Sequence, residues 1–235
     1  MWNFTKKSKD QNSINSISEM NKPDYGKKLD LIQKEIHQFL KPLGFKKRGR
    51  TFNREVESGL FQVINFQSGQ FPVGDNYEIP GVRESFYGKF TVNLGVCIEE
   101  LYLIEFSEKK KPFYQEYDCQ IRNRLETIIQ KTDKWWEIDS DSNNSKIIID
   151  GLKFKGFEWF QLFDTREKII KNWGDPSHSH SSRAQLDVAL IVLQTDKNRG
   201  AKLIQDYFEN IENDKSSHKK YVIDLAKRFD IKIKQ

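Results

Sequence analysis

The stretch Phe90-Thr-Val-Asn-Leu-Gly-Val-Cys-Ile98 alternates large apolar residues with polar or small ones over nine positions. Successive side chains of a β-strand point to opposite faces of its sheet, so this period of two predicts a strand with one apolar face. Cys97 lies on this strand between the apolar residues Val96 and Ile98 and is interpreted as a small core residue rather than a nucleophile. We expect this strand to organise a β-sheet.

The segments on either side of this strand predict the rest of the sheet. Residues 45–55 and 60–68 are interpreted as two strands joined by a turn at Ser58-Gly59. Tyr102, Ile104 and Phe106 continue an alternating pattern and predict a partner strand, and residues 135–138 predict a short one. The first half of the chain is therefore expected to be rich in strands.

Helical spacing of apolar residues predicts the remaining elements. A first helix should begin at Asp24, a good N-cap residue, and end at Pro42 and Gly44. A second helix is expected over 119–131, and residues 186–193, 201–211 and 222–229 predict three more. The fold class that follows is α+β: a twisted antiparallel sheet flanked by helices, with a strand-rich first half and a helix-rich second half.

Composition along the chain suggests three parts. Residues 1–22 are polar and aperiodic and are interpreted as a flexible extension. Residues 23–139 form the predicted α+β domain, including a breaker-rich loop over 69–81. After the polar break at 139–145, residues 146–235 form a helical region, which is either a subdomain or packs on the same core.

Cysteine content and hydropathy indicate the compartment. The chain has only two cysteines, Cys97 and Cys119, where a secreted disulfide scaffold would use more. Its beginning lacks the apolar region of a signal peptide, and no apolar run reaches the about 18 residues that a membrane span needs. We therefore expect a cytoplasmic protein.

Two segments carry the positive charge. The chain has a net charge of +5, but residues 41–54 hold six basic residues and no acidic one. Residues 215–235 hold seven basic residues and two acidic ones, so the rest of the chain is net acidic. The first segment supplies the candidate binding surface, which consists of Lys46, Lys47, Arg48, Arg50, Phe52 and Arg54.

Three interpretations of this basic segment stay open. Cations interleaved with rings could hold a phosphate backbone while Phe45 or Phe52 stacks on a base. The same pattern fits an edge strand whose rings face the core and whose cations guard against unwanted pairing. The third interpretation is a surface for an acidic protein partner.

No chemical motif stands out. His178, His180 and Asp175 share a Ser-rich loop, but a zinc site needs three or four ligands at defined spacing. Glycine-rich phosphate loops, nucleophile elbows and zinc-protease motifs are absent from the sequence. We predict no catalytic residue, no cofactor and no metal.

Several of these stretches resemble a known family. The segment Phe39-Leu-Lys-Pro-Leu-Gly-Phe-Lys-Lys-Arg-Gly-Arg-Thr-Phe-Asn-Arg-Glu55 is followed by Phe61-Gln-Val-Ile-Asn-Phe-Gln-Ser68, by Phe90-Thr-Val-Asn-Leu-Gly-Val96 and by Trp135-Trp136. Over residues 25–140 this order resembles the bacterial family called domain of unknown function 4304. The resemblance implies a small bacterial cytosolic α+β domain with no established activity. Bacterial domains of this kind are often immunity or defence proteins, an inference by analogy.

The leading hypothesis is therefore a non-enzymatic bacterial binding protein that recognises a protein partner, such as a toxin in an immunity pair. The second hypothesis is a nucleic-acid-associated protein that uses residues 41–54 and 215–235. The third is an enzyme whose site is assembled from residues distant in sequence.

Overall fold

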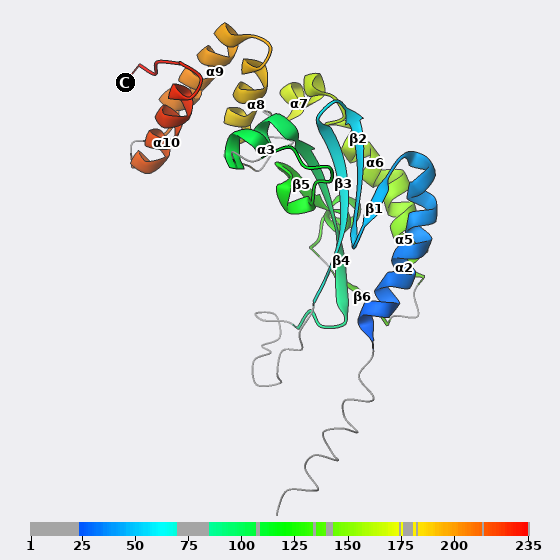
Figure 1. Cartoon of the computed structure of the whole chain (residues 1–235). Coiled ribbons are helices and arrows are strands. Elements are labelled where there is room, and N and C mark those ends of the chain that lie inside the picture. The colour runs from blue at the N-terminus through cyan, green and yellow to red at the C-terminus, as the bar shows by residue number, and fades with distance from the viewer. Residues whose placement is uncertain are drawn as a thin grey trace, which may run out of the picture.

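The computed structural model describes residues 24–69, 85–106, 109–133, 135–139, 143–173, 175, 181, 183–212 and 214–234. The expected extension over 1–22, most of the loop over 69–81, and His178 and His180 lie outside these residues. Within them, six strands form one antiparallel sheet (Figure 1). Its order is β1 (Lys46–Arg48), β2 (Thr51–Glu57), β3 (Leu60–Ser68), β4 (Lys89–Ile98) and β5 (Ile121–Arg124), with β6 (Trp136–Glu137) beside the start of β4.

Strand β4 lies at the centre of this sheet and confirms the strand that the nine-residue alternation predicted. It pairs with β3 from Leu60↔Ile98 to Ser68↔Phe90, and with β5 and β6 along its other edge. Its large apolar side chains, such as Leu94, are fully buried against helices. On the opposite face, Cys97 packs in a smaller cluster with Val63, Tyr102, Tyr114 and Cys119.

One face of the sheet is covered by helices α2 (Tyr25–Leu40), α5 (Asn144–Gly151) and α6 (Phe157–Gln161), with a π-helical turn at Leu152–Gly156 (Figure 1). Helix α2 begins as predicted: the Asp24 carboxylate accepts a hydrogen bond from the Lys27 N–H at 3.0 Å. A 3-10 turn, Lys41–Leu43, follows it, and Gly44 adopts a φ of 87° that suits glycine. Helix α4 (Leu125–Gln130) lies beside β4 and the π-helical turn.

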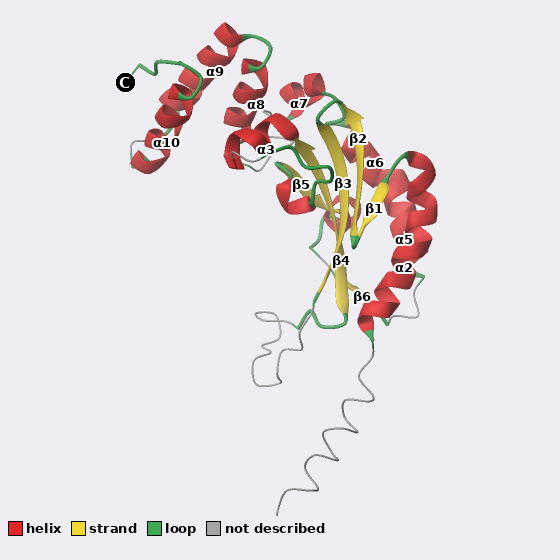
Figure 2. Cartoon of the chain, in the orientation of Figure 1, coloured by secondary structure: helices red, strands yellow, loops and turns green. Residues whose placement is uncertain are grey.

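The remaining helices gather at one end of the sheet (Figure 2). They are α3 (Glu99–Phe106), α7 (Arg166–Asn172), α8 (Ala184–Leu193), α9 (Lys197–Glu209) and α10 (Ser216–Lys227). Residues 186–193 of α8 are all buried, which confirms the predicted apolar helix. A single cluster of buried apolar side chains includes Leu29 of α2, Leu94 of β4, Ile148 of α5 and Val222 of α10.

Three predicted elements are different in the structure. Residues 45–55 are not one strand but the hairpin of β1 and β2, because Gly49 takes a φ of 59° and reverses the chain. Residues 102–106 belong to helix α3, not to a strand. Residues 119–131 are divided between β5 and α4, because Ile121 pairs with Val96 before the helical spacing begins. The fold is nevertheless α+β, with the open antiparallel sheet in the first half and most helices in the second.

Candidate interaction surface

The first strand, β1, is an exposed basic edge of the sheet. Within the described residues it pairs with β2 alone, through Lys46↔Asn53, Lys47↔Phe52 and Arg48↔Thr51. All three β1 residues are exposed. In the described part of the chain, no carboxylate lies within ion-pair distance of Lys46, Lys47 or Arg48, so their charges are uncompensated. We call these three residues the basic edge.

Phe52 does not belong to this surface, contrary to the sequence prediction. Its side chain is fully buried, and its ring centroid lies 5.8 Å from that of His37 and 5.9 Å from that of Phe66. Phe45 is also buried, at 2% exposure. The Nζ of Lys47 lies over Phe52, 5.8 Å from the ring centroid. Neither ring can stack on a base, because each fills the space between the sheet and its helices.

The other two predicted cations are held in place by neighbours. Arg50 donates from Nη1 to the Ser68 hydroxyl and is half-buried. Arg54 donates from Nε (2.9 Å) and Nη2 (2.7 Å) to Gln62 Oε1, and from Nη1 to the Leu43 carbonyl (3.0 Å). The predicted surface therefore separates into a freely exposed basic edge and two anchored arginines.

The opposite face of the sheet carries a polar groove that sequence reasoning did not identify. Among its lining residues, Asn93 donates to Gln67 Oε1 at 3.1 Å. On the same face of the sheet, Asn65 donates to the Thr51 hydroxyl at 2.9 Å. Its arginines are neutralised: Arg122 makes two bonds to Glu116 at 2.5 and 2.9 Å, and Arg124 pairs with Asp133. In the sequence, this groove corresponds to the polar residues that alternate with apolar ones in β3 and β4. A sheet face that is simply exposed to solvent gives the same alternation, so the pattern did not indicate a groove.

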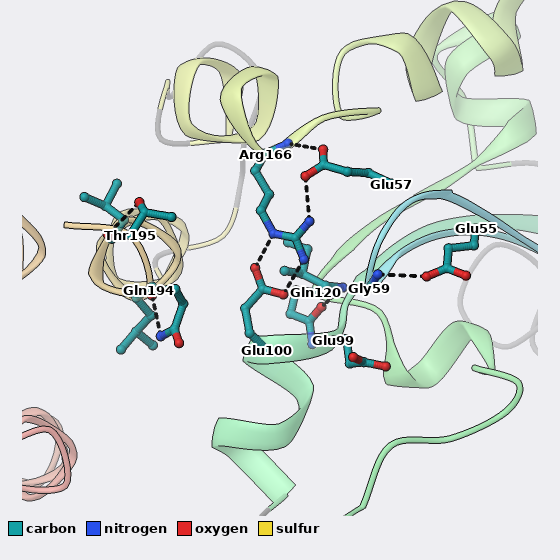
Figure 3. Close-up of polar contacts among 12 residues, drawn as sticks. Glu55, Glu57, Gly59, Glu99, Glu100, Gln120, Arg166, Gln194 and Thr195 are labelled. Atoms are coloured by element: carbon teal, nitrogen blue, oxygen red, sulfur yellow. Dashed lines mark hydrogen bonds and ion pairs between the residues drawn. The ribbon is translucent and has the colours of Figure 1, made fainter. Parts of the chain in front are cut away.

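A cluster of acidic residues at one end of the sheet is held by Arg166 (Figure 3). Its guanidinium makes two 2.7 Å bonds to Glu100 and one 2.7 Å bond to Glu57. Nearby, Glu99 accepts from the Tyr114 hydroxyl at 2.9 Å and pairs with Lys110. This arrangement joins α7 to β2 and α3, and the direct pairing of Glu57 and Glu100 with Arg166 indicates a structural junction rather than a catalytic dyad.

The second basic segment is remote from the basic edge. Helix α10 and the chain end lie at the opposite end of the molecule from β1 (Figure 1). Two of its lysines are also paired, Lys215 with Glu212 at 2.8 Å and Lys227 with Asp224 at 3.3 Å. The two basic segments therefore do not form one continuous surface.

Metal and thiol chemistry find little support in the part of the chain that the structure describes. No group of three or more His, Cys, Asp or Glu side chains is arranged there to hold a metal ion. Cys119 precedes β5 rather than opening a helix, and burial raises its pKa well above the usual thiol value. A buried, protonated thiol is a poor nucleophile. Among the described helices, none has the length and apolar character required to cross a bilayer.

Comparison with known protein families gives a match for the sheet-bearing part of the chain. A family model described as "Domain of unknown function (DUF4304)" matches residues 36–154, just over half of the chain. The matched region runs from α2 through the whole sheet to the π-helical turn, so it contains the basic edge. No curated protein and no solved structure matches the chain.

Proposed function

The chain belongs to the DUF4304 family, and from that premise we propose that it is a non-enzymatic binding protein whose basic edge recognises an acidic segment of a partner protein. The observation that carries this proposal is the basic edge itself. Three adjacent, exposed cations lie on the last strand of a sheet, without carboxylates to compensate them among the described residues. Most cations elsewhere on the sheet are paired or hydrogen-bonded.

An extended acidic segment suits this edge because its backbone can pair with the edge strand and its carboxylates can pair with the three cations. The outer edge of a terminal strand presents N–H and C=O groups that another strand can pair with, a recurrent mode of peptide recognition. Cations on an edge strand discourage neutral or basic strands, because pairing would bury their charge. An acidic strand removes that penalty, so the same residues that protect the edge also select its partner.

A protein partner is better supported than nucleic acid. Single-stranded nucleic acid is usually held by cations together with exposed rings, but Phe45 and Phe52 are buried. The two basic segments of the sequence also lie at opposite ends of the molecule (Figure 1). A basic edge of only three residues provides few phosphate contacts.

The setting we propose is a bacterial cytoplasm, with the chain as the immunity or defence member of a pair and an acidic toxin as its partner. Two supports are physical: both cysteines are free and buried, as suits a reducing compartment, and the sequence pI is about 9.0. A basic protein is poorly matched to a nuclease, whose active site is itself basic. The immunity role rests on analogy with other small bacterial domains.

The test is a titration of labelled peptides followed by fluorescence anisotropy. The probes are an alternating Glu-Val peptide, its Gln-Val counterpart and a single-stranded oligonucleotide. Wild type should bind the acidic peptide, and the K46E/K47E/R48E variant should bind it roughly 10-fold or more weakly, since each exposed pair contributes about 0.2–1 kcal/mol and reversal makes it repulsive. K197E/K202E/K220E, which changes three exposed lysines of α9 and α10, is the matched control and should bind normally.

Two results would contradict the proposal. One is equal binding of the acidic and neutral peptides by wild type. The other is preferential binding of the oligonucleotide, with affinity falling on the order of 10³-fold between 50 and 200 mM salt, which is expected for six or more phosphate contacts.

A further inference from the structure

Arg54 is held in a rigid position that leaves part of its guanidinium unused. The guanidinium carbon lies 4.6 Å from the Phe45 ring centroid and 5.5 Å from that of Phe157. Gln62, its cross-strand neighbour on β3, accepts two of its N–H groups, and the Leu43 carbonyl accepts a third. A guanidinium has five N–H groups. One N–H on each Nη is thus without a partner among the described residues.

The surroundings of Arg54 lower the stability of the fold, which is unexpected for an arginine that has only a structural role. Gln62 is 1% exposed on the helix-covered face of a central strand, where an apolar residue would pack at lower cost. Burial lowers the pKa of Arg54, so its positive charge is partly desolvated. In the described part of the chain no carboxylate lies within 4.0 Å of it. A partly desolvated cation without an ion-pair partner is a feature that structural arginines usually avoid.

Asp164, a carboxylate close to Arg54, does not act as its ion-pair partner. Asp164 interacts with Arg54 through space, but its Oδ1 forms an ion pair with Lys168 Nζ, 2.8 Å away. That ion pair neutralises Asp164 within α7 and its N-terminal turn. The repulsion that Asp164 would exert on a second carboxylate is therefore largely screened.

Arg54 faces a groove of about 340 Å³ between β2 and α6. Part of its lining is apolar, from Val56, Phe157 and Phe160. The polar part comes from Gln62, Gln161 and Thr165 and from the carboxylate of Asp164, which is ion-paired with Lys168. A pocket with apolar walls and a few fixed polar groups suits a ligand that has one charged end and an apolar body. Two N–H groups on neighbouring nitrogens suit a carboxylate better than a single donor would.

We propose that Arg54 and this groove form a binding site for a carboxylate attached to an apolar body, either a small organic acid or the carboxyl terminus of a peptide. The site lies on the helix-covered face of β2. In the basic edge, Lys46 and Arg48 pair with residues of the opposite face, and Lys47 pairs with Phe52 of the same face. This site goes beyond the proposed function, because it does not depend on the basic edge or on any protein partner.

Nuclear magnetic resonance titration tests the site with benzoate, with benzamide as the neutral isostere, and with a Gly-Gly-Val-Phe peptide as the free acid and as the amide. We expect benzoate, but not benzamide, to shift the Arg54 Nε signal and the amides of Val56 and Thr165. Binding should weaken about 10-fold or more in R54Q, because a charge-assisted pair of hydrogen bonds is lost. A free-acid peptide that binds more tightly than benzoate identifies a peptide terminus as the source, and the reverse order identifies a small acid.

V56W provides a second variant, since R54Q also removes packing against Phe45 and Phe157. Val56 is 37% exposed, so a larger side chain there should fill the groove without disturbing the core, and it should abolish benzoate binding. R48Q, on the basic edge, is the control and should bind benzoate as wild type does. Three results would overturn the proposal. They are equal shifts with benzoate and benzamide, no binding of millimolar benzoate by wild type, and unchanged benzoate binding by folded R54Q or V56W.

Discussion

Replacing Arg166 with alanine tests how firmly the helical half is attached to the sheet. The substitution removes three charge-assisted hydrogen bonds, two to Glu100 and one to Glu57, each 2.7 Å long. The bond from the Arg166 backbone N–H to Glu57 at 3.1 Å remains. Glu57 and Glu100 are then left near Glu55 and Glu99 without their cation (Figure 3).

The expected loss follows from the partial burial of this junction. The side chains of Arg166, Glu57 and Glu100 are 24%, 37% and 17% exposed. A fully exposed pair contributes about 0–1 kcal/mol, and breaking a buried pair costs about 3–5 kcal/mol. We therefore expect R166A to lower the free energy of unfolding by about 2–4 kcal/mol.

Urea denaturation followed by tryptophan fluorescence and circular dichroism measures this loss. R166K keeps the charge but not the two-point contact with Glu100, so it should lose less than R166A. A double-mutant cycle with E100Q should give a coupling energy of about 1–3 kcal/mol. A loss below about 0.5 kcal/mol, the range of ordinary surface substitutions, would refute this reasoning.

Two further predictions concern buried positions. A Cβ at Gly95 would lie 2.6 Å from Cys119 Sγ, so G95A should cost about 1–3 kcal/mol of stability, part of which C119A restores in the double variant. Burial raises the pKa of Asp187 from 3.8 to about 6, with Arg183 opposing the shift. The folded carboxyl therefore holds its proton to higher pH than the unfolded one, and this contribution to stability is lost as pH rises from about 4 to 6. In denaturation experiments, the free energy of unfolding of D187N relative to wild type should rise by at most about 3 kcal/mol between pH 4 and pH 7. A difference between the two proteins that does not change with pH would contradict the raised pKa of Asp187.

The elements that the sequence predicted well are those whose signals are local. The alternation of Phe90–Ile98 survives because β4 has neighbours on both edges and an apolar layer on its helix-covered face. Helix α2 has its cap at Asp24, and the 3-10 turn that follows the helix ends at the left-handed Gly44. Local chemistry is enough to define both elements.

The elements that were wrong depend on distant partners. Strand β5 has four residues and exists because Ile121 finds Val96 across the sheet. The turn at Gly49 was hidden because the basic run around it shows no alternation. Helix α3 carries its apolar residues around most of its circumference, and alternate members of such a set imitate a strand.

The candidate surface was predicted in part. The cations of β1 are exposed because the hairpin places them at the sheet edge, whereas the ring of Phe52 faces α2 and His37. The position of Arg54 depends on Gln62 and Phe157. The ion pairs of Arg166 are with Glu100 and Glu57, which precede it in the sequence by 66 and 109 positions. Such long-range pairs leave no periodic pattern in the sequence.

Affinity capture from the native host after nuclease treatment tests whether the basic edge recognises a protein partner. Wild type, K46E/K47E/R48E and K197E/K202E/K220E are used as parallel baits, and stoichiometric companions are identified by mass spectrometry. We expect wild type and the K197E/K202E/K220E control to retain a protein with an acidic segment, and the K46E/K47E/R48E variant to lose it. The same companions on all three baits, or the loss of every companion on nuclease treatment, would contradict it.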